Sequence, residues 1–401
     1  MAPDDADAEP RSTSTPPVPL TTIAREWGRI GTIGFGGPPA HISLLRELCV
    51  VDRGWISDED FEHAIAATNL LPGPASTQLA IFCAWRLRRT LGGLVGGFMF
   101  IVPGLVFILL LSVLFLRSHP PHWVSGIAAG FGAAVPAVAL QAAAGLVPGS
   151  WRGLSASENG PRVRWVLYVV AGGAAAATIG PFLVVVLLGC GLIELIVRSW
   201  PSAAPTERTS MLLPFLLPAV MMVGGLGAVA WVAFKVGALS FGGGFVIVPL
   251  MQADAVHHYH WMTGGQFLNA VALGQITPGP VVQTVSAVGY AAGGIGAALL
   301  AAVVAFAPSF AFILAGARQF ERLRTNVRAQ SFLRGSGPAA IGAIAGSAIP
   351  LGLALSHVWQ VGVLGLAAVW LLALRRGVVS ALLAAGFLGL LAAFAGLPVL
   401  A

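Results

Sequence analysis

Long apolar stretches, separated by short polar ones, follow one another along the chain from about residue 20 to its end. Many reach the roughly 20 residues that an α-helix needs to cross a bilayer, and they lack the short alternation of a membrane β-barrel. The pattern predicts an all-α polytopic membrane protein with roughly 10–13 spans. The expected apolar segments are 20–46, 61–85, 91–116, 123–147, 163–197, 211–228, 229–251, 266–290, 294–317, 336–356, 358–373 and 377–400.

Several motifs recur at one fixed distance. Phe35-Gly36-Gly37 returns 206 residues later as Phe241-Gly242-Gly243, and Pro72-Gly73-Pro74 returns as Pro278-Gly279-Pro280. Many matches at one offset indicate a duplicated unit. The predicted organisation is a disordered tail (1–19), a first repeat of about six helices (20–198), a linker with a bridging helix (199–228) and a second repeat (229–401).

Basic residues in the short loops differ between the two halves. The basic loop of the first half is Arg86–Arg89, whereas the second half carries its arginines one helix later, between residues 318 and 334. Because lysine and arginine mark cytoplasmic loops, the two repeats are expected to have inverted topologies, with the N-terminus in the cytoplasm. Inverted repeats with broken helices are typical of secondary transporters.

Composition narrows the function classes. Only 9% of residues are charged, against about 25% in soluble domains, which excludes an ordinary soluble protein. The net charge of +6 is explained by arginines that set orientation, so nucleic acid is not an expected partner. No nucleotide-binding or nucleophile motif is found, and no cofactor is predicted. Three distant cysteines and the solvated tract His257, His258 and His260 do not predict a metal site.

Four glycine- and proline-rich breaks carry the predicted chemistry. They are GTIGFGGPPAH (31–41), GALSFGGGFVI (237–247), NLLPGPASTQ (69–78) and GQITPGPVVQT (274–284). A break inside a membrane is tolerated where it lines a cavity, and the half-helix that follows presents free N–H groups and a positive dipole end to an anion. The alternative is that these residues only kink helices and allow close packing.

The candidate anion-binding residues come from these breaks and from two basic residues a little over one turn before them. Arg29 and its equivalent Lys235, the single lysine, are expected to pair with a dianion or else to reach a lipid headgroup. The full set is Arg29, Lys235, Phe35, Gly36, Gly37, His41, Asn69, Pro72, Gly73, Pro74, Ser76, Thr77, Gln78, Ser240, Gly242, Gly243, Gln275, Thr277, Pro278, Gly279, Pro280, Gln283 and Thr284.

Further polar residues in apolar surroundings are candidates for proton coupling. They are Glu26, Glu194 and His41, with ion pairing or packing as the alternative for each. The stretch GGLVGG (92–97) contains two GxxxG frames and predicts a close-packing face, either inside the bundle or in a homodimer.

The motifs resemble those of the chromate ion transporter family, in its fused form with two halves. The resemblance rests on GFGGPPAH (34–41), LPGPAST (71–77), SFGGG (240–244) and QITPGPV (275–281), and it covers residues 20–400. It implies efflux of chromate across the bacterial inner membrane, chromate resistance, and a link to sulfate. The second half departs from the first, with Gly244-Phe245 in place of Pro38-Pro39 and Ile247 in place of His41.

The predicted function is therefore secondary active export of chromate. The alternatives are transport of sulfate or another oxyanion, and a passive anion or water channel of the same architecture. A membrane enzyme acting on a phosphorylated lipid ranks last, because the sequence shows no cluster of catalytic carboxylates or histidines.

Overall fold

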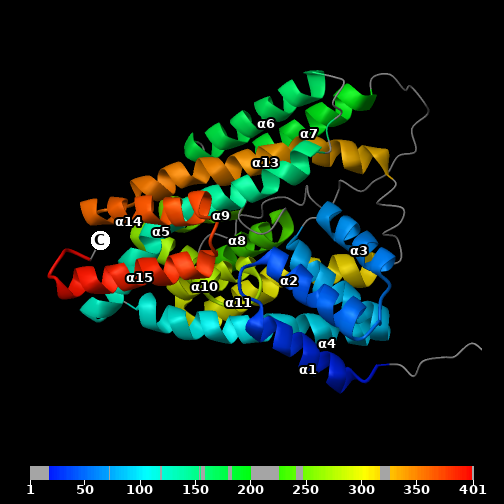
Figure 1. Cartoon of the computed structure of the whole chain (residues 1–401), viewed down its shortest axis with the longest axis horizontal. Coiled ribbons are helices and arrows are strands. Elements are labelled where there is room, and N and C mark those ends of the chain that lie inside the picture. Colours follow the sequence, from blue (N-terminus) through cyan, green and yellow to red (C-terminus); the bar gives the residue numbers. More distant parts are fainter. Residues whose placement is uncertain are drawn as a thin grey trace, which may run out of the picture.

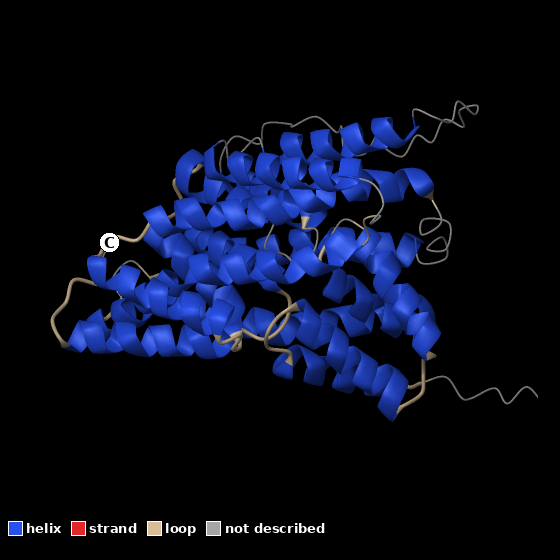
Figure 2. Ribbon diagram, turned by 45° about the horizontal axis from the view of Figure 1, so that its top comes forward, coloured by secondary structure: helices blue, strands red, loops and turns tan. Residues whose placement is uncertain are grey.

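The computed structural model describes residues 18–71, 73–117, 120–152, 154, 159–178, 183–199, 225–240, 247–316 and 326–399. Within these ranges every regular element is a helix, as the all-α prediction requires (Figure 2). Most of the predicted bridging helix, Pro72, Gly242, Gly243 and the side chain of Asn69 lie outside the described residues.

Two matching series of helices build the fold (Figure 1). The first is α1 (Leu20–Ile33), α2 (Pro38–Arg46), η1 (Glu47–Asp52), α3 (Asp58–Leu70), α4 (Ala75–Phe115), α5 (His122–Arg152), α6 (Asn159–Thr178) and α7 (Leu183–Ser199). The second is α8 (Gly225–Leu239), α9 (Ile247–Gln252), η4 (Ala253–His258), α10 (Gly264–Ile276), η5 (Val281–Gln283), α11 (Thr284–Gly316), α13 (Val327–Leu353), α14 (Val358–Ala368), η7 (Val369–Ala373) and α15 (Val378–Phe394). The π-helices η1 and η4 correspond residue for residue at the 206-residue offset, as do α3 and α10, which confirms the duplication.

The breaks interrupt helices where the sequence predicts. The first separates α1 from α2, and the second separates α3 from α4. Gly36, Gly37, Gly73 and Gly279 have φ values of 100°, 73°, 123° and 92°, a region in which only glycine is unstrained. The predicted segments 20–46 and 61–85 are therefore each two helices joined by a glycine turn.

Helices α4 and α11 are hairpins rather than straight rods. The backbone reverses at Arg88–Arg89 in α4 and at Gly293–Gly294 in α11, where Arg89 has φ 50° and Gly294 has φ 71°. A Cβ on Gly92 would lie 2.2 Å from the carbonyl oxygen of Ala84, so the two arms of α4 pack in direct contact. The GGLVGG stretch is thus a packing face inside the bundle, which decides between the two alternatives for it.

The two repeats run in opposite directions and are interlocked. In Figure 1, α7 ends at the right of the molecule while its counterpart α15 ends at the left, beside the C-terminus. Helix α5 packs against α14 and α15 of the other repeat, and α13 packs against α6 and α7. Small residues allow these contacts: a Cβ on Gly130 would lie 2.1 Å from the oxygen of Ala385, and one on Gly172 would lie 1.9 Å from that of Ala339.

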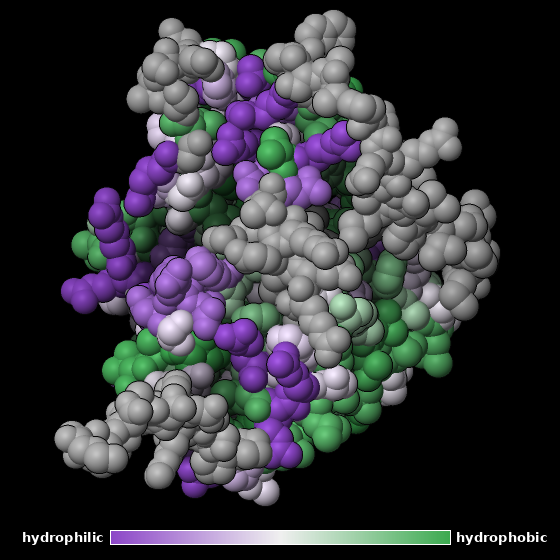
Figure 3. Space-filling model, turned by 90° about the vertical axis from the view of Figure 1, so that its right-hand side faces the viewer, coloured by the Kyte–Doolittle hydropathy of each residue, from purple (hydrophilic) through white to green (hydrophobic). Residues whose placement is uncertain are grey.

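The outer surface suits a lipid environment. Within the described part of the chain, four elements are long and apolar enough to cross a membrane, namely Ala75–Phe115, His122–Arg152, Val281–Gly316 and Val327–Leu353, and the first and third of these are the hairpins. Large apolar side chains such as Leu110, Val185 and Val303 are exposed on the flanks. Hydrophilic side chains gather instead over one end of the molecule (Figure 3). The chain is a multi-pass membrane protein.

Candidate functional site

Three of the four breaks are joined around His41 and the carbonyl group of Gly34. The backbone N–H of Gly279, in the second repeat, donates to the oxygen of Gly34 over 3.0 Å. His41 Nε2 donates to the same oxygen over 2.9 Å, and His41 Nδ1 lies 3.3 Å from the hydroxyl of Ser76. Because a carbonyl only accepts, Nε2 carries the hydrogen, which leaves Nδ1 to accept from Ser76 in the neutral ring. His41 therefore joins the breaks at full burial, with its ring packed edge-on against Phe100.

Each PGP turn packs against the proline-containing arm of the opposite repeat. A Cβ on Gly104, which follows Pro103 in α4, would lie 2.2 Å from the oxygen of Pro278. Gln283 Nε2 donates to the oxygen of Ile101 over 2.6 Å and so fixes this contact.

The reverse contact joins Gly73 to Ser309. Ser309 follows Pro308 in α11 and is the counterpart of Gly104. A Cβ on Gly73 would lie 3.2 Å from the Ser309 hydroxyl. The two contacts are thus related by the repeat.

Both PGP turns open a half-helix without a capping side chain. Pro74 precedes α4 and Pro280 precedes η5, and neither offers a group that accepts from the first N–H groups. Such an uncapped start favours an anion, provided that further donors surround it.

Buried hydroxyl groups supply such donors. Among the described residues, Thr77 Oγ1, Ser240 Oγ and Ser309 Oγ are buried and have no hydrogen-bond partner. A buried hydroxyl without a partner costs about 1–3 kcal/mol, so these groups are poised for a ligand or water that accepts hydrogen bonds. Thr77 lies in the first turn of α4, and Ser309 contacts the turn that precedes it.

The remaining break residues differ in their roles. Thr277 and Thr284 donate to the carbonyl oxygens of Leu273 and Val281 in their own segments. Gln78 is fully buried, with its amide folded toward Gly73, whereas Phe35 is 44% exposed. Buried side-chain atoms without a partner in the described part of the chain also include Gln275 Nε2 and Gln283 Oε1.

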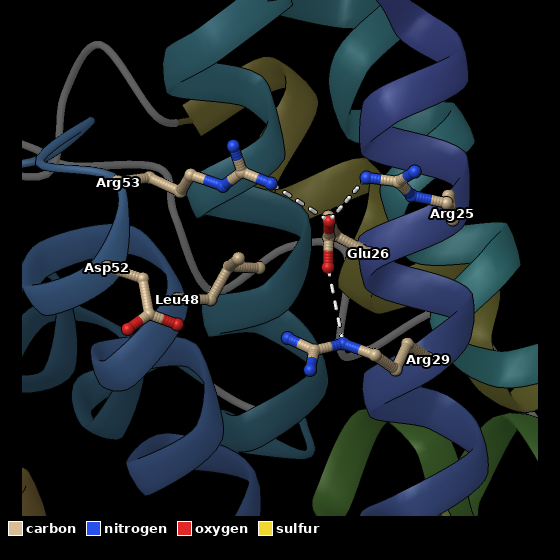
Figure 4. Close-up of a pocket in the computed structure, with 6 residues that line it drawn as sticks. All are labelled: Arg25, Glu26, Arg29, Leu48, Asp52 and Arg53. Atoms are coloured by element: carbon tan, nitrogen blue, oxygen red, sulfur yellow. Dashed lines mark hydrogen bonds and ion pairs between the residues drawn. The ribbon is translucent and has the colours of Figure 1, made fainter.

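The two basic residues predicted to hold a dianion both have carboxylate partners. Arg29 Nε lies 3.2 Å from Glu26, which Arg25 and Arg53 also contact at the edge of a cavity (Figure 4). Lys235 Nζ lies 2.6 Å from Asp254 and 5.6 Å from the ring centre of Trp231. Within the described residues, no hydrogen bond joins Arg29 or Lys235 to a break.

Glu194 lies in a separate charged cluster between α6 and α7. Its carboxylate accepts from Arg164 over 2.8 Å, from Arg198 over 2.6 Å and from Tyr168 over 3.1 Å, and its side chain is 4% exposed. Two arginines compensate the buried charge, which agrees with the ion-pairing alternative for this residue.

Several residues that contact the breaks or pair with the candidate charged residues were not identified from the sequence. They are Arg25, Arg53, Ile101, Gly104, Asp254 and Ser309. The signal for Gly104 and Ser309 was present: Pro103 and Pro308 match at an offset of 205, because the arm before the hairpin turn is one residue shorter in the second repeat than in the first. Across the described residues, no group of three or more histidine, cysteine or carboxylate side chains forms a metal site.

Comparison with known proteins gives a consistent assignment. The profile of the family described as "Chromate transporter" matches residues 21–195 and 227–390, one segment in each repeat. The "Chromate transport protein" of Cupriavidus metallidurans is 30% identical over 87% of this chain and 86% of its own length. The protein of that name from Pseudomonas aeruginosa is 29% identical over 84% of this chain and 82% of its own length.

A cyanobacterial relative and the solved structures complete the comparison. The "Probable chromate transport protein" of Synechococcus elongatus is 27% identical over 88% of this chain and 91% of its own length. No solved structure matches the chain significantly. With paired breaks in two inverted repeats and a profile that spans both, the chain belongs to the chromate transporter family.

Proposed function

We propose that this protein is a secondary active transporter that exports chromate, or a similar tetrahedral oxyanion such as sulfate, across the bacterial inner membrane. The observation that carries the proposal is the pair of uncapped half-helices at the PGP turns, the first of which has the buried, unpartnered hydroxyls of Thr77 and Ser309 beside it. An oxyanion accepts hydrogen bonds at every oxygen and donates none or few, so this arrangement of donors suits it. The relatives named for chromate transport support chromate as the substrate.

The unequal contacts of the two turns support alternating access. The second turn is held by the Gly279–Gly34 hydrogen bond and by Gln283, which donates to Ile101, whereas the Ser309 hydroxyl beside the first turn has no partner among the described residues. Inverted repeats can exchange these two arrangements, because the same packing recurs on the opposite side of the membrane. The present arrangement is then one of two related states, and transport is their interconversion around a bound dianion.

The proposed direction of transport and its energy source rest on the loop charges of the chain and on the charge of the dianion. The loop arginines of the first half support a cytoplasmic N-terminus. Export of a dianion is favoured by a membrane potential that is negative inside, at about 2.3 kcal/mol per charge per 100 mV. Among the proton-coupling candidates, Glu26 lines a cavity, whereas the hydrogen bonds of His41 and Glu194 hold them inside the bundle. A homodimer would have to use a face other than the glycines of GGLVGG, which are buried.

The test is uptake of radiolabelled chromate into inverted membrane vesicles, with and without an uncoupler. Replacing Thr77 by Val and Ser309 by Ala removes two donors and should slow uptake at least about tenfold, since a hydrogen bond to a charged group contributes about 1.5–3 kcal/mol. Thr178→Val, whose hydroxyl bonds within α6 away from the breaks, is the control.

Each arm of the experiment has a defined meaning. Wild-type rates in the Thr77 and Ser309 variants would refute the proposed site. Uptake that never exceeds equilibrium with the imposed gradient would indicate the passive anion channel. Competition by sulfate measures whether the site distinguishes the two oxyanions.

A further inference from the structure

A cavity of about 360 Å³ opens between α1 and η1, away from the breaks (Figure 4). Arg25, Glu26, Arg29, Leu48, Asp52 and Arg53 line it. Its volume lies in the usual range for small-molecule sites and far exceeds the roughly 30 Å³ that one water occupies in the liquid. The cavity is therefore large enough for a hydrated or partly hydrated inorganic anion.

Three guanidinium groups converge on one carboxylate in this cavity. Arg25 and Arg53 donate to Glu26 Oε1 over 3.0 and 3.3 Å, and Arg29 Nε lies 3.2 Å from Oε2. The Glu26 side chain is only 8% exposed, whereas the three arginine side chains are 44–73% exposed. Each guanidinium has five N–H donors, so the contacts to Glu26 use a minority of them. Three positive charges face the two negative charges of Glu26 and Asp52.

The second repeat shows that the fold does not require this cluster. At the 206-residue offset, the positions of Arg25, Glu26 and Arg53 hold Trp231, Val232 and Tyr259. The position of Arg29 holds Lys235, which forms a salt bridge with Asp254. Asp254 occupies the position of Leu48, which lines the cavity in the first repeat. The first repeat thus has exposed guanidinium donors where the second has a single compensated pair.

We propose that the cavity is a second oxyanion site, which binds a tetrahedral dianion in competition with Glu26 before the ion reaches the breaks. This inference rests on the proposed function, whose dianion it names as the occupant. The planar fork of arginine matches tetrahedral oxyanions, and three forks around one cavity offer donors to several oxygens at once. Glu26 holds the arginines in place while the site is empty and repels the dianion when it arrives.

Competition with Glu26 gives an unusual signature. Replacing Glu26 by Gln removes one negative charge a few ångströms from the dianion and should tighten binding about tenfold in a water-filled cavity. Replacing Arg25 and Arg53 together by Gln should weaken binding at least about tenfold. A cluster with a purely structural role would not bind the dianion in the wild-type chain, so wild-type binding that the Arg25 and Arg53 variant loses is the result that identifies the site.

The experiment measures binding of radiolabelled sulfate to the purified full-length chain in phosphatidylcholine nanodiscs. Arg46→Gln is the matched control, because Arg46 pairs with Asp58 and Glu62 on the exposed surface outside the cavity. Gel filtration and thermal unfolding confirm that each variant is folded. Tighter binding by Glu26→Gln together with weaker binding by the Arg25 and Arg53 variant supports the site, and the absence of either change overturns it.

Two further arms separate the alternatives. Nanodiscs with added phosphatidylglycerol test the lipid phosphate: if this lipid displaces sulfate, the site belongs to a headgroup and the proposal for a free dianion fails. Equal sulfate binding in both discs supports it. Transport by the Thr77 and Ser309 variant reports on the breaks independently, so the proposed function and the second site can fail separately.

Discussion

Gly104 offers the sharpest test of how the repeats fit together. In Gly104→Ala, the new Cβ would lie 2.2 Å from the oxygen of Pro278 and 2.4 Å from Gln283 Oε1. Carbon and oxygen need well over 3 Å, so the second PGP turn must retreat by roughly 1 Å. Overpacking of this kind costs about 1–3 kcal/mol, and here the obstacle is backbone that cannot rotate away. We expect a lower unfolding temperature and a large loss of transport, because the retreat also strains the Gly279–Gly34 hydrogen bond.

The assay compares chromate uptake per folded molecule and thermal unfolding followed by tryptophan fluorescence. Gly145→Ala is the matched control: it lies in helix α5, and a Cβ there meets nothing within 4 Å. By helix propensity alone, that control should be neutral or slightly stabilising. Wild-type transport and stability in Gly104→Ala would refute the inference that this contact is part of the transporting structure.

Three other substitutions test the surrounding interactions. His41→Ile, the residue of the second repeat, should lower stability by about 1–3 kcal/mol because the Gly34 and Ser76 contacts lose their partner; unchanged thermal unfolding would contradict this. Lys235→Met should reduce abundance, because it leaves the buried Asp254 carboxylate without its counter-charge at a cost of about 3 kcal/mol in folding free energy. Lys235→Met combined with Asp254→Asn should restore abundance, and equal losses in the single and double variants would refute the pairing. Glu194→Gln should destabilise the α6–α7 region yet leave uptake per folded molecule and its uncoupler sensitivity unchanged; altered sensitivity would instead support proton coupling at Glu194.

The helices and the duplication were predictable because their signals are local. Apolar length marks a span, and glycine with proline marks a break, whatever the rest of the chain does. The fixed offset then located η1 and η4, and α3 and α10, in matching registers. The predicted spans 91–116 and 294–317 likewise correspond to the second arms of the α4 and α11 hairpins.

The partners of the charged residues were not predictable, because they depend on how the breaks fold the chain back. Lys235 and Asp254 lie on opposite sides of the second FGG motif, and Arg53 reaches Glu26 across the first. The sequence gives the cost of a charge inside a membrane segment, but it does not say whether a ligand or a carboxylate compensates that charge. The contact of Gln283 with Ile101 spans 182 residues and follows only from the crossed packing of the repeats.

The inequality of the two repeats has a consequence for mechanism. Identical inverted repeats would make the two states equal in energy, and a ligand shifts such an equilibrium only by its differential affinity for them. Here the second turn has two backbone contacts and the Gln283 hydrogen bond, while buried hydroxyls without described partners, Thr77 and Ser309, lie around the first. The empty protein should therefore favour the observed arrangement. A dianion that satisfies the hydroxyls of the first turn stabilises whichever state holds them closest, so substrate binding, rather than symmetry alone, determines which of the two arrangements predominates.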